Sequence, residues 1–170
     1  SGDTEFSGKI SNEINISVTL NKVTITDGSE FSTNAGIITT TEGIENLGSL
    51  TFSGGENTNV VEGEGGKTVI AGEVENSALI DQNIDVNTGA SLTSGLSNIG
   101  GAIDNDGDLI LNDDNEEGAG SILANAITGS GDTEFSGKIS NENNISVTQN
   151  KETIKDGSEF WTNAGIIKTK

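Results

Sequence analysis

An acidic segment between residues 104 and 117 holds the densest group of side chains that could bind a metal ion. Carboxylate oxygens are ligands that Ca²⁺ prefers. When Gly107 is placed at the sixth position of a twelve-residue calcium loop, Ala102 falls at the first ligand position and has no side-chain oxygen. The twelfth position then holds an aspartate, which is shorter than the glutamate typical of such loops. We therefore expect weak or no calcium binding rather than a structural calcium site, no other cofactor, and these candidate ligands: Asp104, Asp106, Asp108 and Asp113.

Asp113 and Asp114 are the candidate carboxylates for acid–base catalysis of the kind found in carbohydrate-cleaving enzymes. Adjacent residues on a strand point to opposite faces, so these two would pair only within a loop. The chain has no histidine and no cysteine, and all eight of its basic residues are lysines. The commonest general base, thiol chemistry and the bidentate arginine are therefore missing. We expect no enzymatic activity, and a solvated acidic loop that projects from the fold is the alternative interpretation of this segment.

The net charge of −19 argues against two classes of partner. Nucleic acids and anionic membrane surfaces are both negatively charged and would repel such a chain. No run of about 20 apolar residues occurs, so we expect no membrane insertion of this segment. The chain has no methionine and starts within a repeat, which we interpret as an excised fragment of a longer protein.

The chain nearly repeats itself at its two ends. Residues 1–41 return as residues 130–170, with 34 of 41 positions identical after a shift of 129. Such a tandem unit is typical of repeat architectures, in which each unit stacks on its neighbours. We therefore predict one domain over residues 1–170, with the internal repeat at both ends.

A shorter motif recurs within the long unit, in which a glycine precedes an apolar or aromatic residue by three or four positions. The spacing between these glycines is 18 to 26 residues and averages about 21.5 over the long unit, which would divide it into six short repeats. A repeat of this length is close to one turn of a parallel β-solenoid. We predict about eight coils, each marked by one of these glycines: Gly2, Gly28, Gly48, Gly66, Gly89, Gly107, Gly131 and Gly157.

Strand patterning supports an all-β fold. Between Ile14 and Ile25, aliphatic residues alternate with asparagine, serine and threonine, as in a half-buried strand. No segment shows a sustained apolar stripe at helical spacing, so we expect almost no helix. Only 31% of the chain is hydrophobic, and a solenoid tolerates this because each coil covers the next.

A second recurring element combines a glycine, an aliphatic residue and an asparagine. Asparagine tolerates the left-handed conformation and bonds to its own backbone, which suits sharp corners. We therefore predict structural corners rather than a binding role, with some of these side chains stacked into ladders along the coils: Asn12, Asn46, Asn76, Asn105 and Asn141.

These residues carry a family resemblance. The segments 31–38, 98–111 and 127–137 resemble the Gly/Asn/Thr-rich repeats of bacterial autotransporter and related surface-adhesin passengers. Gly100–Ile103 is similar to the Gly-Gly-Ala-Ile motif of chlamydial polymorphic outer membrane proteins. The resemblance implies a right-handed, pectin-lyase-like parallel β-helix, an extracellular or bacterial cell-surface location, and a host-surface protein or glycan as partner.

The second copy of the repeat differs from the first mainly by gaining polarity. Our hypothesis is that residues 130–170 form a C-terminal cap, in which added charge discourages stacking at an open edge. Ordinary drift between repeats is the alternative. Trp161, the only tryptophan, is either a packing lid, which we prefer, or a contact residue. The seven changes are Ile14 to Asn143, Leu20 to Gln149, Val23 to Glu152, Thr26 to Lys155, Ser32 to Trp161, Thr39 to Lys168 and Thr41 to Lys170.

The functional expectation is a rigid stalk segment of a bacterial surface or secreted adhesin that is itself adhesive. The alternative is an engineered, capped fragment that assembles end to end through its open solenoid edges. Neither expectation identifies a receptor.

Overall fold

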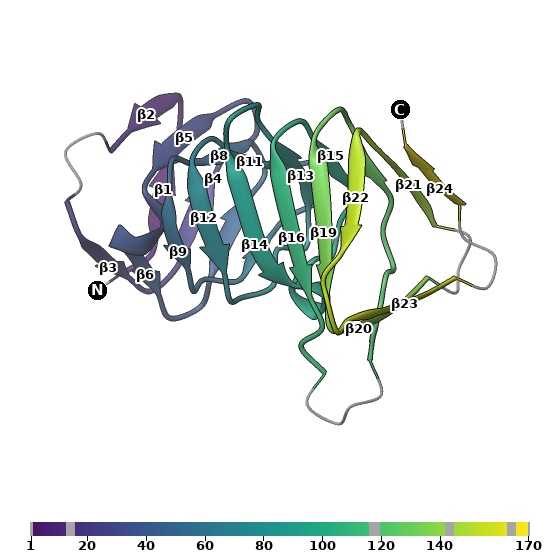
Figure 1. The fold of residues 1–170 in the computed structure, drawn as a ribbon. Coiled ribbons are helices and arrows are strands. Elements are labelled where there is room, and N and C mark those ends of the chain that lie inside the picture. Colours follow the sequence, from purple (N-terminus) through teal and green to yellow (C-terminus); the bar gives the residue numbers. More distant parts are fainter. Residues whose placement is uncertain (1, 13–15, 116–119, 142–144, 163–165, 170) are drawn as a thin grey trace.

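The computed structural model shows a parallel β-solenoid of about eight coils, with the two ends of the chain at opposite ends of the rod (Figure 1). It describes residues 2–12, 16–115, 120–141, 145–162 and 166–169. All strand pairs within these ranges are parallel, and each strand pairs with a strand about 19 residues away. The prediction of an all-β parallel solenoid of about eight coils is confirmed.

The longest sheet runs along the whole rod and has nine strands. Each of its strands belongs to a different coil. In spatial order they are β2 (Lys9–Ser11), β5 (Glu30–Thr33), β8 (Ser49–Phe52), β11 (Lys67–Ile70), β13 (Asn83–Val86), β15 (Ile103–Asn105), β18 (Ile127–Thr128), β21 (Ser146–Gln149) and β24 (Ile166–Thr169).

Four shorter sheets complete the other sides of the coils. The four-stranded sheet holds β1 (Thr4–Phe6), β4 (Val23–Ile25), β7 (Ile44–Asn46) and β10 (Val61–Glu62), and the two-stranded sheet holds β3 (Val18–Leu20) and β6 (Ile38–Thr40). The six-stranded sheet holds β9 (Gly55–Asn57), β12 (Glu73–Asn76), β14 (Ser91–Gly95), β16 (Asp108–Asn112), β19 (Asp132–Ser136) and β22 (Lys151–Ile154). The three-stranded sheet holds β17 (Ser121–Ile122), β20 (Lys138–Asn141) and β23 (Glu159–Thr162), and two short 3₁₀ helices are η1 (Ala35–Ile37) and η2 (Leu96–Asn98).

The core is a set of side-chain columns that run along the rod axis. In β8, Leu50 and Phe52 are fully buried, while Ser49 and Thr51, which alternate with them, face outward, and this is the period of two seen in the sequence. Because the strands pair in register, equivalent residues of successive coils stack on one another. One such column in the nine-stranded sheet consists of Ile10, Phe31, Leu50, Thr68, Ile84, Ile103, Ile127, Val147 and Ile167.

The coils are shorter than the sequence predicted, about 19 residues instead of about 21.5. The prediction assumed that every marker glycine occupies the same place in its coil. In fact Gly28 and Gly48 precede strands of the nine-stranded sheet, whereas Gly107 and Gly131 precede strands of the six-stranded sheet. The markers therefore move from one sheet to another along the chain, and some intervals contain more than one full coil.

The long repeat is consequently not a whole number of coils. Six steps of pairing lead from Ile10 to Ile127, and the next leads to Val147, but the copy of Ile10 is Ile139 between them. The unit thus contains six coils and about half of another. Nearly identical sequences accordingly occupy different sheets: β2 and β5 lie in the nine-stranded sheet, and their copies β20 and β23 lie in the three-stranded sheet.

Glycine is required where neighbouring coils approach most closely. A Cβ atom on Gly107 would collide with the carbonyl oxygen of Ala90, and one on Gly131 would collide with that of Gly107. The obstacle in both cases is backbone, which does not move aside easily. These marker glycines therefore permit close approach between coils at the turn before the strand.

We predict that the buried column dominates stability. Leu50→Ala should lower the free energy of unfolding by about 3 kcal/mol, because it removes buried surface and leaves a cavity. The matched control Thr51→Ala, on the outer side of the same strand, should cost less than about 1 kcal/mol. Chemical denaturation measures both, and equal costs would contradict this account of which side of β8 is the core.

Candidate functional site

The candidate calcium ligands do not converge. Asp104 on β15 and Asp108 at the start of β16 are exposed, and Asp106 in the turn between them accepts hydrogen bonds from the backbone and hydroxyl of Ser130 in the next coil. Asp113 follows β16. Within the described residues, no group of three or more acidic side chains has the geometry to hold a metal ion.

Asp113 links its own turn to the following coil. Its Oδ1 accepts a 2.7 Å hydrogen bond from the Ser121 hydroxyl and a 3.1 Å bond from the Asn115 N–H, and its Oδ2 accepts a 3.2 Å bond from the Lys138 N–H. The hydrogen bond from Ser121 is the main reason that the pKa of Asp113 lies below its usual value. A carboxylate held in this way is an acceptor and not a proton donor at neutral pH.

Asp114 instead contacts the preceding coil. Its carboxylate accepts hydrogen bonds from the backbone N–H and the hydroxyl of Ser97 in η2. Asp113 and Asp114 therefore point to different neighbours, and Ser121 contacts both. The arrangement ties the end of β16 to the coils on either side.

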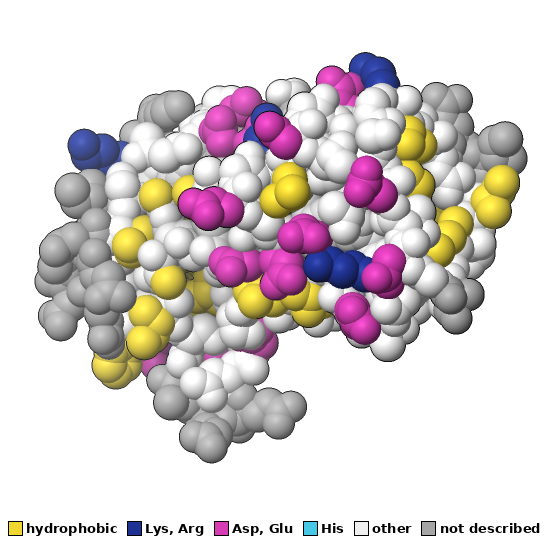
Figure 2. All heavy atoms as spheres, turned by 180° about the vertical axis from the view of Figure 1, so that it is seen from behind, with side chains coloured by type: hydrophobic (Ala, Val, Ile, Leu, Met, Phe, Trp, Pro, Cys, Tyr) yellow, Lys and Arg dark blue, Asp and Glu magenta, His cyan; other side chains and the backbone are white. Residues whose placement is uncertain are grey.

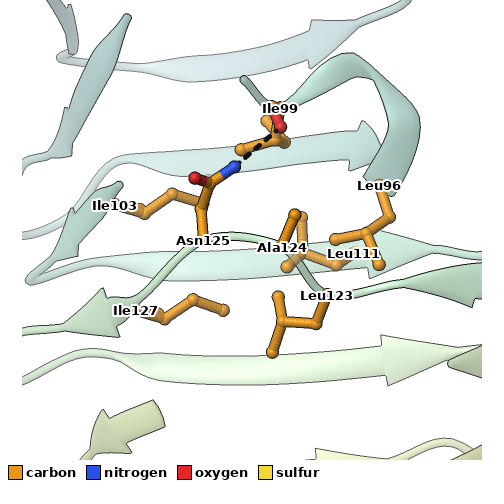
Figure 3. A pocket seen from close by; sticks show the side chains of 8 residues that line it. All are labelled: Leu96, Ile99, Ile103, Leu111, Leu123, Ala124, Asn125 and Ile127. Carbon is orange, nitrogen blue, oxygen red and sulfur yellow. Dashed lines mark hydrogen bonds between the residues drawn. The ribbon is translucent and has the colours of Figure 1, made fainter. Parts of the chain in front are cut away.

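An internal void lies beneath this region, and its volume is about 10 Å³. Figure 3 shows aliphatic side chains surrounding it, together with the Asn125 amide, which donates a 3.2 Å hydrogen bond to the Ile99 carbonyl. This volume is at the lower limit for a single water molecule. The lining residues are Leu96, Ile99, Ile103, Leu111, Leu123, Ala124, Asn125 and Ile127.

The predicted corner asparagines lie at the ends of strands. Asn46 and Asn105 accept hydrogen bonds from the N–H two residues later, at 3.2 and 3.1 Å, which closes the turn. Asn12 and Asn141 instead bridge to residues four positions ahead. Asn46, Asn76, Asn105 and Asn141 belong to four different sheets, and Asn12 follows β2, five steps from β15 in the nine-stranded sheet, so the five do not stack on one another. Asn76 does form a ladder, but with Asn57 and Ser94 of the adjacent coils.

Two buried polar clusters of the same design lie in the core. In each, the Asn amide donates to a glutamine Oε1 of a later coil, at 2.8 Å from Asn46 to Gln82 and at 2.6 Å from Asn105 to Gln149. A threonine hydroxyl also donates to the same glutamine oxygen, from Thr68 in the first cluster and Thr133 in the second. The sequence reasoning missed both clusters, because no spacing is common to the two sets.

Gln149 is therefore not an exposed flank of a cap. Its side chain is fully buried and completes the second cluster. Its counterpart Leu20 is only half-buried in the first coil. The change from leucine to glutamine supplies an acceptor for two buried donors and does not add charge to an edge.

Four other predicted cap residues lie in the last coil: Glu152, Lys155, Trp161 and Lys168. Lys155 and Lys168 are exposed, and Trp161 is 68% exposed, so it does not form a closed lid over the core. Lys155 makes only a distant 3.9 Å pair with Glu134. Asn143 and Lys170 lie outside the described residues.

Glu152 differs from the other changes because it faces inward. It occupies the position of Val23, which is fully buried in the first copy. Both of its carboxylate oxygens are buried and have no hydrogen-bond partner. Burial raises the pKa of Glu152 above its ordinary value, and this effect outweighs the backbone N–H groups of Gln149 and Glu152, which lower it.

The surface is acidic with interspersed lysines. Figure 2 shows acidic side chains forming most of the charged surface on one side of the rod. Several lysines bridge successive coils, such as Lys67 to Asp85 at 2.6 Å and Lys22 to Glu45 at 3.0 Å. These exposed pairs contribute little to stability individually. No helix among the described residues is long and apolar enough to cross a bilayer.

No protein-family model, curated protein or solved structure matches this chain.

We predict that restoring the apolar residue of the first copy at position 149 is destabilising. Gln149→Leu should lower the free energy of unfolding by about 1–3 kcal/mol, because it leaves the buried donors of Asn105 and Thr133 without their acceptor. Adding Thr133→Val should recover part of this loss. Chemical denaturation of the single and double variants measures the coupling between Gln149 and Thr133. An unchanged or raised stability in Gln149→Leu would contradict the role of Gln149 as the buried acceptor.

Glu152 should make stability depend on pH. Because the folded state raises the pKa of this carboxyl, stability is greatest when the group is neutral and falls as pH rises from its ordinary pKa of 4.5 towards the raised value. Glu152→Gln should remove this part of the pH dependence, whereas Glu159→Gln on β23 should retain it. Thermal melts from pH 4 to 8 make the comparison, and parallel curves for wild type and Glu152→Gln would refute it.

Proposed function

We infer that this chain is a rigid structural segment of a bacterial cell-surface or secreted adhesin, without catalysis or a cofactor. The observation that supports this inference most directly is the nine-stranded sheet, which passes from β2 to β24 along one hydrophobic core. In a solenoid, each coil is held by its neighbours, so length is gained by adding coils. The resemblance to surface-adhesin repeats supplies the location, outside the cell or on its surface, and the expected right-handed sense of the coils.

The proposed mechanical role follows from coil geometry. Neighbouring strands lie about 4.8 Å apart, so the eight steps from β2 to β24 give a rod of roughly 38 Å. A 129-residue unit, with six and a half coils, adds about 31 Å. The number of coils would therefore set the reach of the parent protein.

The proposed adhesive role is supported by the side chains on the surface and by the half-coil offset between the two copies of the repeat. The two copies occupy different sheets, so the same sequence is presented on different sides of the rod. A host-surface protein or glycan would meet repeated, acidic, threonine-rich strands on more than one side. Nucleic acid is not a partner in this proposal, because the net charge of −19 opposes it.

The alternative is a capped, engineered fragment that assembles end to end. One observation favours the end-to-end assembly: the last strand of each of three sheets, β22, β23 and β24, has a neighbour on one side only among the described residues. Unpaired strand edges promote association with another chain.

Binding of the purified chain to an array of glycans and extracellular-matrix proteins tests the adhesive role. We expect saturable binding to a small subset of ligands at physiological salt, with no requirement for calcium. Heat-unfolded chain is the control for binding through charge alone. Equal binding of folded and unfolded chain, or none at all, would contradict adhesion.

Small-angle X-ray scattering separately tests the rod. We expect an elongated, rigid particle whose length grows by about 31 Å when one more 129-residue unit is added. A scattering curve typical of a flexible chain would contradict the structural role.

A further inference from the structure

The two copies of the repeat place nearly the same sequence in two different environments. In the first copy, β4 and β5 are covered by the next coil, which spans residues 42–62. Their copies β22 and β23, with β24, form the last coil of the rod, at the right of Figure 1. The first copy therefore shows what packs on this sequence when a further coil is present.

The covering coil makes four kinds of contact with the first copy. Ile44 pairs in register with Val23, and Leu50 with Phe31. Asn59 donates a 2.9 Å hydrogen bond from its amide to the Ile38 carbonyl. In addition, Glu45 forms a 3.0 Å ion pair with Lys22. The covering coil is therefore held on the first copy by apolar packing, strand pairing, an amide hydrogen bond and an ion pair.

Three of the four groups that receive these contacts are retained in the second copy, as Lys151, Phe160 and Ile167. Ile25 is fully buried in the first copy, and its counterpart Ile154 is 49% exposed. Ile38 is 3% exposed, and its counterpart Ile167 is 39% exposed. Lys151, the counterpart of Lys22, has no ion pair within the described residues.

We propose that the edge formed by β22, β23 and β24 is a docking surface for one further solenoid coil with the sequence pattern of residues 42–62. The occupant would add a parallel strand to β22 and to β23, as β7 and β8 do to β4 and β5, and it would cover Ile154, Phe160 and Ile167. Its acidic residue at the position of Glu45 would pair with Lys151. This inference goes beyond the rod function and does not depend on the adhesive role.

Glu152 sets how tightly this edge binds. It replaces Val23, the residue on which Ile44 of the covering coil packs. Docking would place an isoleucine over this half-buried residue and remove the water that remains around it, and the isoleucine side chain offers no hydrogen-bond donor to the carboxylate. Glu152 therefore weakens docking without abolishing the complementarity of the rest of the edge.

Trp161 provides a direct readout at this edge. Its counterpart Ser32 lies between Ser11 and Thr51 on the two adjacent strands. A docked coil would place the residue equivalent to Thr51 beside the exposed indole. Because Trp161 is the only tryptophan, binding at the other end of the rod leaves its fluorescence unchanged.

The test is a titration of the full chain with a synthetic peptide of residues 42–62, followed by Trp161 fluorescence and by anisotropy of a label on the peptide. We expect a saturable blue shift that coincides with the anisotropy change. Glu152→Val should strengthen the affinity about tenfold, because the buried charge is removed. The matched control Glu159→Val removes a charge from the same edge and should change the affinity less than threefold, roughly the effect of an exposed charge.

A peptide carrying Leu50→Asp is the negative control, because it places a carboxylate against Phe160. The proposal is overturned by peptide binding without a fluorescence shift, by equal binding of the Leu50→Asp peptide, or by no binding at millimolar peptide. A blue shift that depends on protein concentration alone would identify a second copy of the chain as the occupant and would also overturn the assignment.

Discussion

The structure depends on one constraint, namely that each coil is completed by the next. The backbone groups of a strand bond to the coils on either side, and its inward side chains pack on those above and below. This explains how a chain with only 31% hydrophobic residues maintains a continuous core. It also makes the two ends of the rod different from every position between them, since only there does a coil lack one neighbour.

Polar groups are compatible with this core when their partners come from other coils. The Asn46 and Asn105 clusters each collect donors from two coils onto one glutamine oxygen, so they join coils that are not adjacent in sequence. Glu152 is the opposite case, because its buried oxygens have no partner. Two of the sequence changes between the copies therefore have opposite effects on stability. Gln149 supplies a hydrogen-bond acceptor to buried donors, whereas Glu152 places an unpaired carboxylate at the end of the core.

The sequence was sufficient to predict strands, parallel coils and their approximate number. The alternation over Val18–Leu20 and Val23–Ile25 and the recurrent glycines carry that information locally, whereas Ile16, part of the same alternation in the sequence, lies outside the strands and is 59% exposed. Coil length was wrong because a glycine such as Gly89 marks a turn but does not say which sheet follows it. Gln149 was misplaced for a related reason, since its role depends on Asn105, 44 residues earlier, and on the half-coil phase between the copies. No local pattern reveals such a partner.

The most direct test of the account is a set of distances along the outer side of the nine-stranded sheet. Spin labels at Ser32 and Asp104 are four coil steps apart, and labels at Ser32 and Thr128 are five, in positions joined by register. Pulsed electron paramagnetic resonance should give narrow distributions near 19 and 24 Å, which are about 4.8 Å per step. Broad distributions, or a second distance that does not exceed the first by about one strand spacing, would contradict the parallel solenoid in this register.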